Sequence, residues 1–233
     1  KYSSKNENSI DLVLFINGIP IFTAELKNQF TKQDVDDAVR QYKTNRLPKG
    51  EPFLQFGRCL AHFAVDLKNV KMCTHLNGAK SRFLPFDKGN AGGAGNPYQT
   101  ITNSYPTDYL WRNTWSKITI LNLLQHFMLH EPVKDKPKRG KSKKLGTLIF
   151  PRYHQLHAVN SLIEMARNDG SGHKYLIQHS AGSGKSNTIA WLSHRLSQLQ
   201  DNKDERVFNA IIIITDRRIL NNQLQHTIQS YEK

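Results

Sequence analysis

The sequence predicts an α/β protein, because strand-like runs near its start and a glycine-rich loop near its end both fit that class. The runs at 10–16 and 19–26 are apolar and rich in β-forming residues, and Asn17-Gly18 between them is a strong hairpin-turn signal. The second half of the chain reads helix, strand, glycine loop, helix, strand. This order is typical of a nucleotide-binding α/β unit.

Composition limits the choice of function. The chain has 233 residues, which is enough for one large domain or two small ones at about 100–200 residues per domain. It carries 33 Lys plus Arg against 19 Asp plus Glu, a net charge of +14, which favours nucleic acid or an anionic surface as partner. Runs such as 210–214 are far shorter than the roughly 20 apolar residues of a membrane span.

The cysteines and the start of the chain suggest its setting. Cys59 and Cys73 are too few for a disulfide framework or a four-thiolate zinc site, so we expect reduced core residues of a cytoplasmic protein. The chain begins with Lys1 and a polar stretch rather than with methionine. We expect it to be a piece of a longer protein.

Periodicity and turn signals predict further elements in both halves of the chain. In the first half they favour a helix at 34–43, strands at 60–65 and 70–76, and a helix at 114–129. In the second half they favour helices at 152–168 and 185–200 and strands at 175–178 and 209–215. A glycine- and asparagine-rich loop covers 88–107, and the basic stretch 131–146 reads as a linker or a solvated hairpin tip, with a domain boundary near 145.

Two carboxylates and a lysine stand near the ends of the first two predicted strands. Asp11 lies in an otherwise apolar run, where a charged side chain is costly unless it has a function or a partner. Glu25 lies at the end of the second strand, and Lys27 lies just beyond it. Carboxylate oxygens bind Mg²⁺, which activates water and shields the phosphate in phosphodiester cleavage, and a lysine can orient that water. The plainer alternative is a solvated strand edge.

Strand register tests this metal site. A two-residue turn at Asn17-Gly18 would pair residue 11 with residue 24 and send Asp11 and Glu25 to opposite faces of the hairpin. A three-residue loop would pair residue 11 with residue 23 and bring both carboxylates and the lysine to one face. We therefore predict either that odd loop or a bulge elsewhere, near Pro20.

Residues 11–27 closely resemble the nuclease core of the restriction (R, HsdR-type) subunit of type I restriction enzymes. Those subunits belong to the PD-(D/E)xK nucleases, so the resemblance implies a restriction-endonuclease-like mixed sheet flanked by helices. It also implies that Asp11 and Glu25 are metal ligands and that Lys27 is the catalytic lysine.

The resemblance continues through 28–30 and 35–42, with one departure. Related nucleases carry Gln-x-x-x-Tyr on the next helix, whereas here Ala38 stands four residues before Tyr42 and Gln41 stands beside it. Gln41 and Tyr42 are therefore only candidate DNA contacts.

The glycine-rich loop is a candidate nucleotide site. Gly182, Ser183 and Gly184 follow a predicted strand and lead into a predicted helix, where backbone N–H groups cradle phosphates. Lys185 would reach the β- and γ-phosphates of ATP, and Ser186 would hold Mg²⁺. A chance glycine turn is the alternative, although it would place a lysine at a helix start for no purpose.

The strict form of the phosphate-loop pattern has glycine where this chain has His179, and the loops of superfamily 2 helicases also lack that glycine. Sequences on either side of the loop resemble the same helicases. Residues 150–155 resemble the adenine-reading element, which implies that Arg152 and Gln155 belong to the nucleotide site. Thr215 and the following residues resemble a DNA-strand motif, which implies phosphate contacts from Arg217 or Arg218. A polar helix start and a solvated basic turn are the plain alternatives.

Together these features predict an endonuclease domain at 1–145 and the incomplete start of a RecA-like helicase domain at 146–233. No Asp-Glu pair of the motor type follows Ser186, so we expect weak ATP binding without efficient hydrolysis. The resemblance implies a type I site-specific deoxyribonuclease that cleaves double-stranded DNA with Mg²⁺ (or Mn²⁺) during ATP-driven translocation. It would act with modification (methyltransferase) and specificity subunits. We expect no membrane partner.

Two alternatives remain open. One is a stand-alone helicase–nuclease of DNA repair or phage defence. The other is a degenerate nuclease fold that only clamps DNA. Metal affinity separates the second from a working nuclease.

Overall fold

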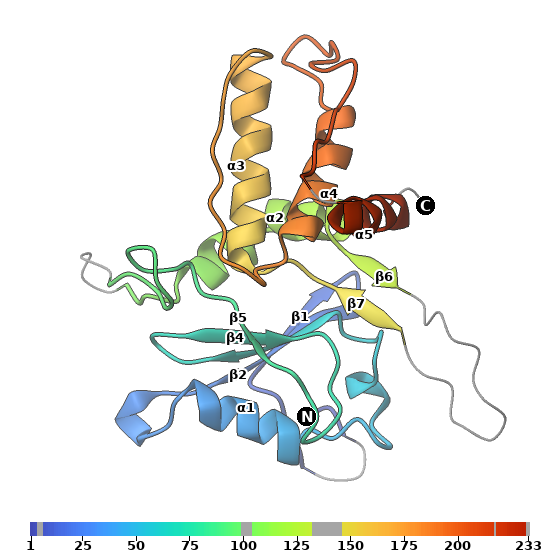
Figure 1. Cartoon of the computed structure of the whole chain (residues 1–233). Coiled ribbons are helices and arrows are strands. Elements are labelled where there is room, and N and C mark those ends of the chain that lie inside the picture. The colour runs from blue at the N-terminus through green and yellow to red at the C-terminus, as the bar shows by residue number, and fades with distance from the viewer. Residues whose placement is uncertain (4–6, 99–103, 132–145, 217, 232–233) are drawn as a thin grey trace, which may run out of the picture.

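The chain folds around a mixed five-stranded sheet with helices on both faces (Figure 1). The computed structural model describes residues 1–3, 7–98, 104–131, 146–216 and 218–231, without the side chains of 218–223. One helix, α1, lies beneath the sheet in Figure 1, and α2 and the foot of α3 lie above it. The α/β prediction with a mixed sheet is confirmed.

The sheet has the order β1-β2-β3-β4-β5. Its elements are β1 (Leu12–Ile16), β2 (Ile19–Leu26), α1 (Val35–Thr44), β3 (Ala61–Val65), β4 (Val70–Cys73) and β5 (Leu84–Pro85). The β2 and β3 strands are parallel, with α1 between them in the chain, and the other neighbours are antiparallel. Every strand and helix predicted between 10 and 76 is present within a few residues, and the short β5 was missed.

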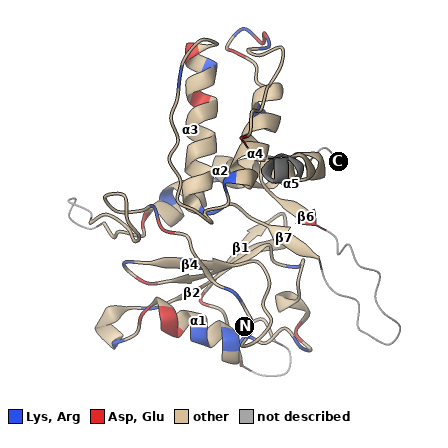
Figure 2. Cartoon of the chain, viewed as in Figure 1, with Lys and Arg blue, Asp and Glu red and all other residues tan. Residues whose placement is uncertain are grey.

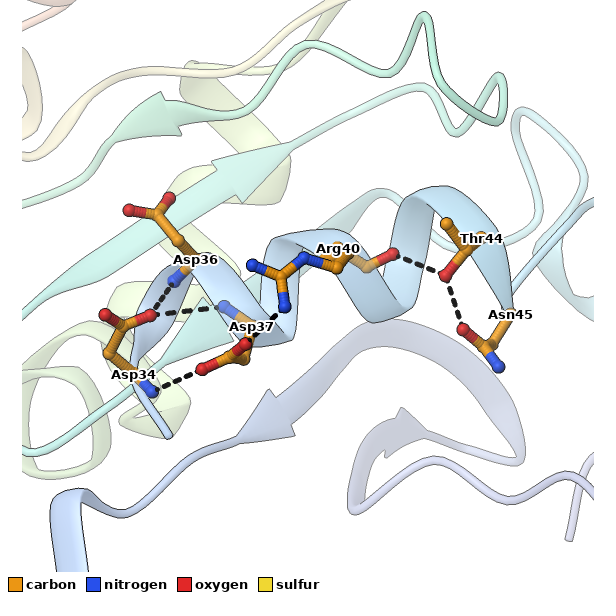
Figure 3. Close-up of polar contacts among 6 residues, drawn as sticks. All are labelled: Asp34, Asp36, Asp37, Arg40, Thr44 and Asn45. Carbon is orange, nitrogen blue, oxygen red and sulfur yellow. Dashed lines mark hydrogen bonds and ion pairs between the residues drawn. The ribbon is translucent and has the colours of Figure 1, made fainter. Parts of the chain in front are cut away.

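The α1 helix begins at a strong sequence signal. The Asp34 carboxylate accepts hydrogen bonds from the backbone N–H groups of Asp36 and Asp37, and the Asp37 carboxylate accepts one from the Asp34 N–H, which makes a capping box (Figure 3). The buried Asp66 also accepts from the N–H of Val35 and so anchors the helix to the end of β3. The stripe that faces the sheet comprises Val35, Ala38, Val39 and Tyr42, all buried.

The opposite face of the sheet carries an aromatic core. The Phe63 ring lies at its centre, 5.2 Å from Trp115, 5.5 Å from Phe22 and 5.5 Å from Phe86 between ring centroids. Phe150, from the second half of the chain, lies edge-on at 6.3 Å from Phe63. Both halves of the chain therefore contribute to one apolar cluster.

The second half of the structure is mostly helical. Its elements, with those just before it, are η3 (Leu110–Thr114), α2 (Lys117–His126), β6 (Leu129–Glu131), β7 (Thr147–Ile149), α3 (Tyr153–Asp169), α4 (Lys185–Ser197) and α5 (Arg218–Ser230). The predicted helix at 114–129 is shorter than expected, since a π-helical turn precedes it and β6 follows. The β6 and β7 strands pair on either side of the basic stretch, most of which, with the boundary near 145, lies outside the described residues.

The strands predicted at 175–178 and 209–215 are wrong. Neither segment pairs with another strand among the described residues, and Leu176, Ile212 and Ile214 are 94%, 83% and 90% exposed. A strand forms only where a neighbouring backbone accepts its hydrogen bonds, and an apolar run does not supply that neighbour. The RecA-like start is consequently not shown, although its two predicted helices are present.

Within the described part of the chain, no helix combines the length and the apolar character that crossing a bilayer requires.

Candidate functional site

The hairpin of β1 and β2 contains both a tight turn and a bulge. Asn17 and Gly18 have φ angles of 49° and 80°, as a two-residue turn with two left-handed positions requires. The register shifts just after Leu14, because Ile21 is an extra residue on β2, next to Pro20. Of the two predicted alternatives, the bulge near Pro20 is confirmed, and the three-residue loop is not what forms.

The bulge brings the two carboxylates to one face of the hairpin. Leu12 pairs with Ala24, so the same register carried one residue further places Asp11 opposite Glu25. Asp11 Oδ2 accepts a hydrogen bond of 2.8 Å from the N–H of Leu26, which holds the side chain across the strand pair. Without the extra residue, the two-residue turn would have put the carboxylates on opposite faces.

Glu25 is the most constrained member of the site. Its side chain is fully buried, and its Oε1 accepts a 2.6 Å hydrogen bond from Nε of Arg46, itself 7% exposed. Its Oε2 is also buried and has no hydrogen-bond partner among the described residues. Burial raises the pKa of Glu25 to about 7, against the lowering effect of Arg46. Asp11 raises this pKa and Lys27 lowers it, so both charges act on the carboxyl.

These donors fit a divalent cation. A buried carboxylate oxygen without a partner is costly, and a metal ion would satisfy it. Among the described residues, no group of three or more His, Cys, Asp and Glu could hold a metal. Mg²⁺ needs fewer, since it is usually bound through one or two carboxylates and keeps several waters. Asp11 and Glu25 are such a pair.

Lys27 stands two residues after Glu25 and so on the same face of β2. Its backbone N–H donates to the carbonyl of Val65 at 2.8 Å, which extends the pairing of β2 with β3. Its side chain borders a hollow of about 260 Å³. The other lining residues are Gln33, Asp37, Arg40, Gln41, Thr44 and Asn45.

Figure 3 shows the outer face of α1, which forms one wall of this hollow. Arg40 is held by Asp37 at 2.7 Å, and the Thr44 hydroxyl donates to the Arg40 carbonyl at 2.9 Å. Acidic residues stand at the start of α1 and basic residues near its end (Figure 2). Of the two candidate DNA contacts on this helix, Gln41 lies beside Lys27 in the hollow.

Tyr42 does not. It has no exposed surface, and its hydroxyl lies 2.8 Å from Thr23 Oγ1. Thr23 Oγ1 in turn lies 2.7 Å from His62 Nδ1, and burial lowers the pKa of His62 to about 3. Tyr42 therefore belongs to a neutral buried network behind Glu25 and cannot meet DNA in this conformation, which corrects its place among the candidate DNA contacts.

Sequence reasoning missed Arg46, which binds Glu25, and the buried pair of Thr23 and His62. Arg46 lies 21 residues from Glu25 in the chain, and Thr23 and His62 are 39 residues apart. No local pattern encodes such pairings. Only the polar residues inside β2 and β3, two otherwise apolar strands, hinted at a buried network.

The glycine-rich loop forms a turn directly before α4. Gly182 and Gly184 have φ angles of 71° and 85°, in the left-handed region, and α4 begins at Lys185. A Cβ on Gly184 would lie 2.6 Å from Nε2 of Gln155, so a larger residue there would displace that side chain. Ser186 is exposed in the first turn of the helix.

Side chains from the start of α3 hold three consecutive carbonyls of this loop. Arg152 Nη2 donates to Gly182 at 3.4 Å, and His154 Nε2 lies 3.2 Å from the Ser183 carbonyl oxygen. Gln155 Nε2 donates to the Gly184 carbonyl at 2.9 Å. These three contacts hold the loop against the start of α3, and α4 begins at Lys185 directly after the loop.

The predicted nucleotide residues are thus brought together around the loop. Lys185 Nζ donates to the carbonyls of His179 and Ser180 at 3.2 and 2.9 Å, and Ser183 Oγ is buried without a partner in the described structure. The Gln155 side chain is 4% exposed, and its Oε1 accepts from the Arg152 N–H at 2.9 Å. Its contact with adenine stays a prediction.

The two arginines proposed for DNA contact cannot be placed. Arg217 lies outside the described residues, and Arg218 begins α5 with a side chain that the structure does not describe.

Comparison with known proteins matches both halves of the chain. Residues 1–81 match the family described as type I restriction enzyme R protein N terminus, and residues 154–233 match SWI2/SNF2 ATPase. The chain is 28% identical over 234 residues to the putative type I restriction enzyme MjaVIIIP endonuclease subunit of Methanocaldococcus jannaschii, covering 96% of this chain and 20% of that protein. It is 24% identical over 229 residues to the type I restriction enzyme HindI endonuclease subunit of Haemophilus influenzae, covering 94% and 20%.

The chain therefore spans about a fifth of the length of the curated relatives that it matches. No solved structure matches it.

Proposed function

We propose, from the premise that this chain is an HsdR-type protein, that its first half is a divalent-metal-dependent nuclease acting on double-stranded DNA. The observation that carries the proposal is the bulged hairpin, which sets Asp11 opposite Glu25, and the charge of Lys27 also acts on Glu25. The buried Oε2 of Glu25, which has no partner within the described residues, gives the metal a ligand atom. The net charge of +14 suits a polyanionic substrate.

Each residue has a distinct role in this proposal. Asp11 and Glu25 would hold Mg²⁺ or Mn²⁺, which when bound supplies a more acidic water and neutralises charge on the phosphate. Lys27 presents a cation to the hollow between β2 and α1, where a phosphate of the cleaved strand is stabilised by it. Gln41, on the other wall, offers an uncharged donor to the neighbouring backbone.

The second half of the chain supports a further part of the proposal, which is binding of ATP with Mg²⁺ at the loop 182–186. In the whole protein this site would drive translocation along DNA, coupled to cleavage. Modification and specificity subunits would be the partners, in the cytoplasm. Both halves together favour a restriction subunit over a stand-alone nuclease, because the relatives named above are restriction endonuclease subunits.

Metal-dependent cleavage by the purified chain tests the nuclease. Supercoiled plasmid incubated with the chain and Mg²⁺ or Mn²⁺ should be converted to nicked and linear forms, and the same mixture with EDTA should leave it intact. Agarose gel electrophoresis resolves the three forms. Plasmid that is bound in a mobility-shift assay but left uncut by either metal would contradict the proposal and favour a DNA clamp.

Replacing Lys185 with alanine tests the nucleotide site. The change removes the ammonium that would meet the phosphates, so ATP affinity should fall by about tenfold or more, the equivalent of a charged hydrogen bond of about 1.5–3 kcal/mol. A fluorescent ATP analogue, titrated in the presence of Mg²⁺, measures it. Lys174→Ala, at an exposed position of the same half, is the matched control. Equal affinity in both variants would contradict the site.

A further inference from the structure

Arg46 and Glu25 form an ion pair in which both side chains are buried. Their side chains are 9% and 0% exposed, whereas every other ion pair found among the described residues has at least one partner that is 65% exposed or more. The two groups meet at 2.6 Å through Nε of Arg46 and Oε1 of Glu25. Such a pair is weak evidence for stability, because the cost of burying both charges offsets their attraction.

The surroundings keep Arg46 in place. It lies two residues beyond the end of α1, and its guanidinium stands 5.9 Å from the centre of the Tyr2 ring. Tyr2 stacks on Phe53 at 5.9 Å between centroids. Tyr2 therefore packs on one side of the Arg46 guanidinium, and the guanidinium is directed toward Glu25.

We propose that Arg46 is a positioning residue for the metal centre, and that its bond to Oε1 fixes the Glu25 carboxylate so that Oε2 alone is presented to the ion. The proposal rests on the proposed nuclease function. Two features of the geometry support it: the arginine engages only one of the two oxygens, and the other is buried without a partner in the described structure. A carboxylate held at one oxygen cannot rotate to expose both. The ion that this site would bind is a hard divalent cation, and water molecules would complete its coordination.

An opposite role would be competition, in which the arginine occupies the place of the ion and weakens its binding. The two roles predict opposite signs for the same substitution, because loss of a positioning group weakens metal binding and loss of a competing cation strengthens it. A measurement of metal affinity therefore separates them without any enzyme assay.

The experiment compares Mn²⁺ affinity in the whole chain and its variants by electron paramagnetic resonance, in which the sharp signal of the free ion measures what remains unbound. Arg46→Met retains much of the side-chain length without a donor, and should weaken Mn²⁺ binding by about 10- to 100-fold, as loss of an outer-shell partner does. Arg46→Lys retains a donor without the fixed fork, and should fall between Arg46→Met and the parent. Arg112→Met, at an exposed arginine paired with Asp108, is the matched control and should bind as the parent does.

Circular dichroism shows which variants fold. Parent-like or tighter Mn²⁺ binding in folded Arg46→Met would overturn the proposal, and if that variant does not fold, parent-like or tighter binding in Arg46→Lys would do so. A parent that binds no Mn²⁺ would instead overturn the metal centre itself, and with it the proposed function. The two failures are thus told apart by the parent alone.

Discussion

Replacing Glu25 with glutamine is expected to lower metal-dependent DNA cleavage by about 100-fold or more, because a metal that supplies several kcal/mol of transition-state stabilisation loses a charged ligand. The glutamine side chain has nearly the same shape and retains an oxygen that can accept from Arg46, so the fold should be kept. Initial rates of plasmid cleavage in Mg²⁺ and in Mn²⁺ measure the effect. They are best compared at pH 8, above the raised pKa of Glu25 of about 7, where the parent carboxyl is mostly ionised.

Glu164→Gln is the matched control, since it makes the same chemical change at an exposed position on α3. Its cleavage rate should equal that of the parent. Cleavage by Glu25→Gln at a parent-like rate would mean that the carboxylate is not a ligand, and that the nicking activity belongs to another site or to a contaminant.

Replacing Trp191 with alanine should reduce the free energy of unfolding by about 3–5 kcal/mol, the usual cost of removing a buried large aromatic side chain. Trp191 is 1% exposed, its ring lies 5.4 Å from that of Phe127, and its Nε1–H donates to the Phe127 carbonyl at 3.0 Å. The side chain fixes α4, and with it the glycine-rich loop before α4, to the end of α2. Urea denaturation followed by circular dichroism measures the change.

Two further variants sharpen this prediction. Trp191→Phe keeps an aromatic ring and loses the hydrogen bond, so its cost should be clearly smaller than that of alanine. Trp111→Ala removes a half-buried tryptophan that packs on Trp115 and should also cost less. A loss of about 1 kcal/mol or less in Trp191→Ala would show that α4 is not fixed to the core in this way.

The first half of the fold was readable from sequence because its signals are local. Asn17-Gly18 specified the hairpin, and the apolar periodicity of residues 34–43 specified α1. Even the bulge next to Pro20 followed from requiring two carboxylates on one face, an argument that uses only the two-residue period of a strand.

The second half was read less well, for a physical reason. The apolar segments that include Leu176 and Ile212 look like strands, but strands depend on neighbours that the described structure does not provide. The helix α5 was missed because Thr215 and the residues after it were interpreted as a DNA-strand motif, without a helix.

The candidate site shows the same division. Asp11, Glu25 and Lys27 came from spacing and resemblance, whereas Arg46 could not, since it meets Glu25 only after α1 has folded against β2. Tyr42 lies on the apolar stripe of α1 that the sheet covers, so the helix periodicity accounts for its burial better than the family motif does.

We propose that the β1–β2 hairpin holds a divalent metal, and calorimetric titration of Mn²⁺ into the chain and into Asp11→Ala measures this binding directly. We expect saturable binding in the parent that is lost in the variant. Absence of binding in the parent, or equal binding in both proteins, would contradict it.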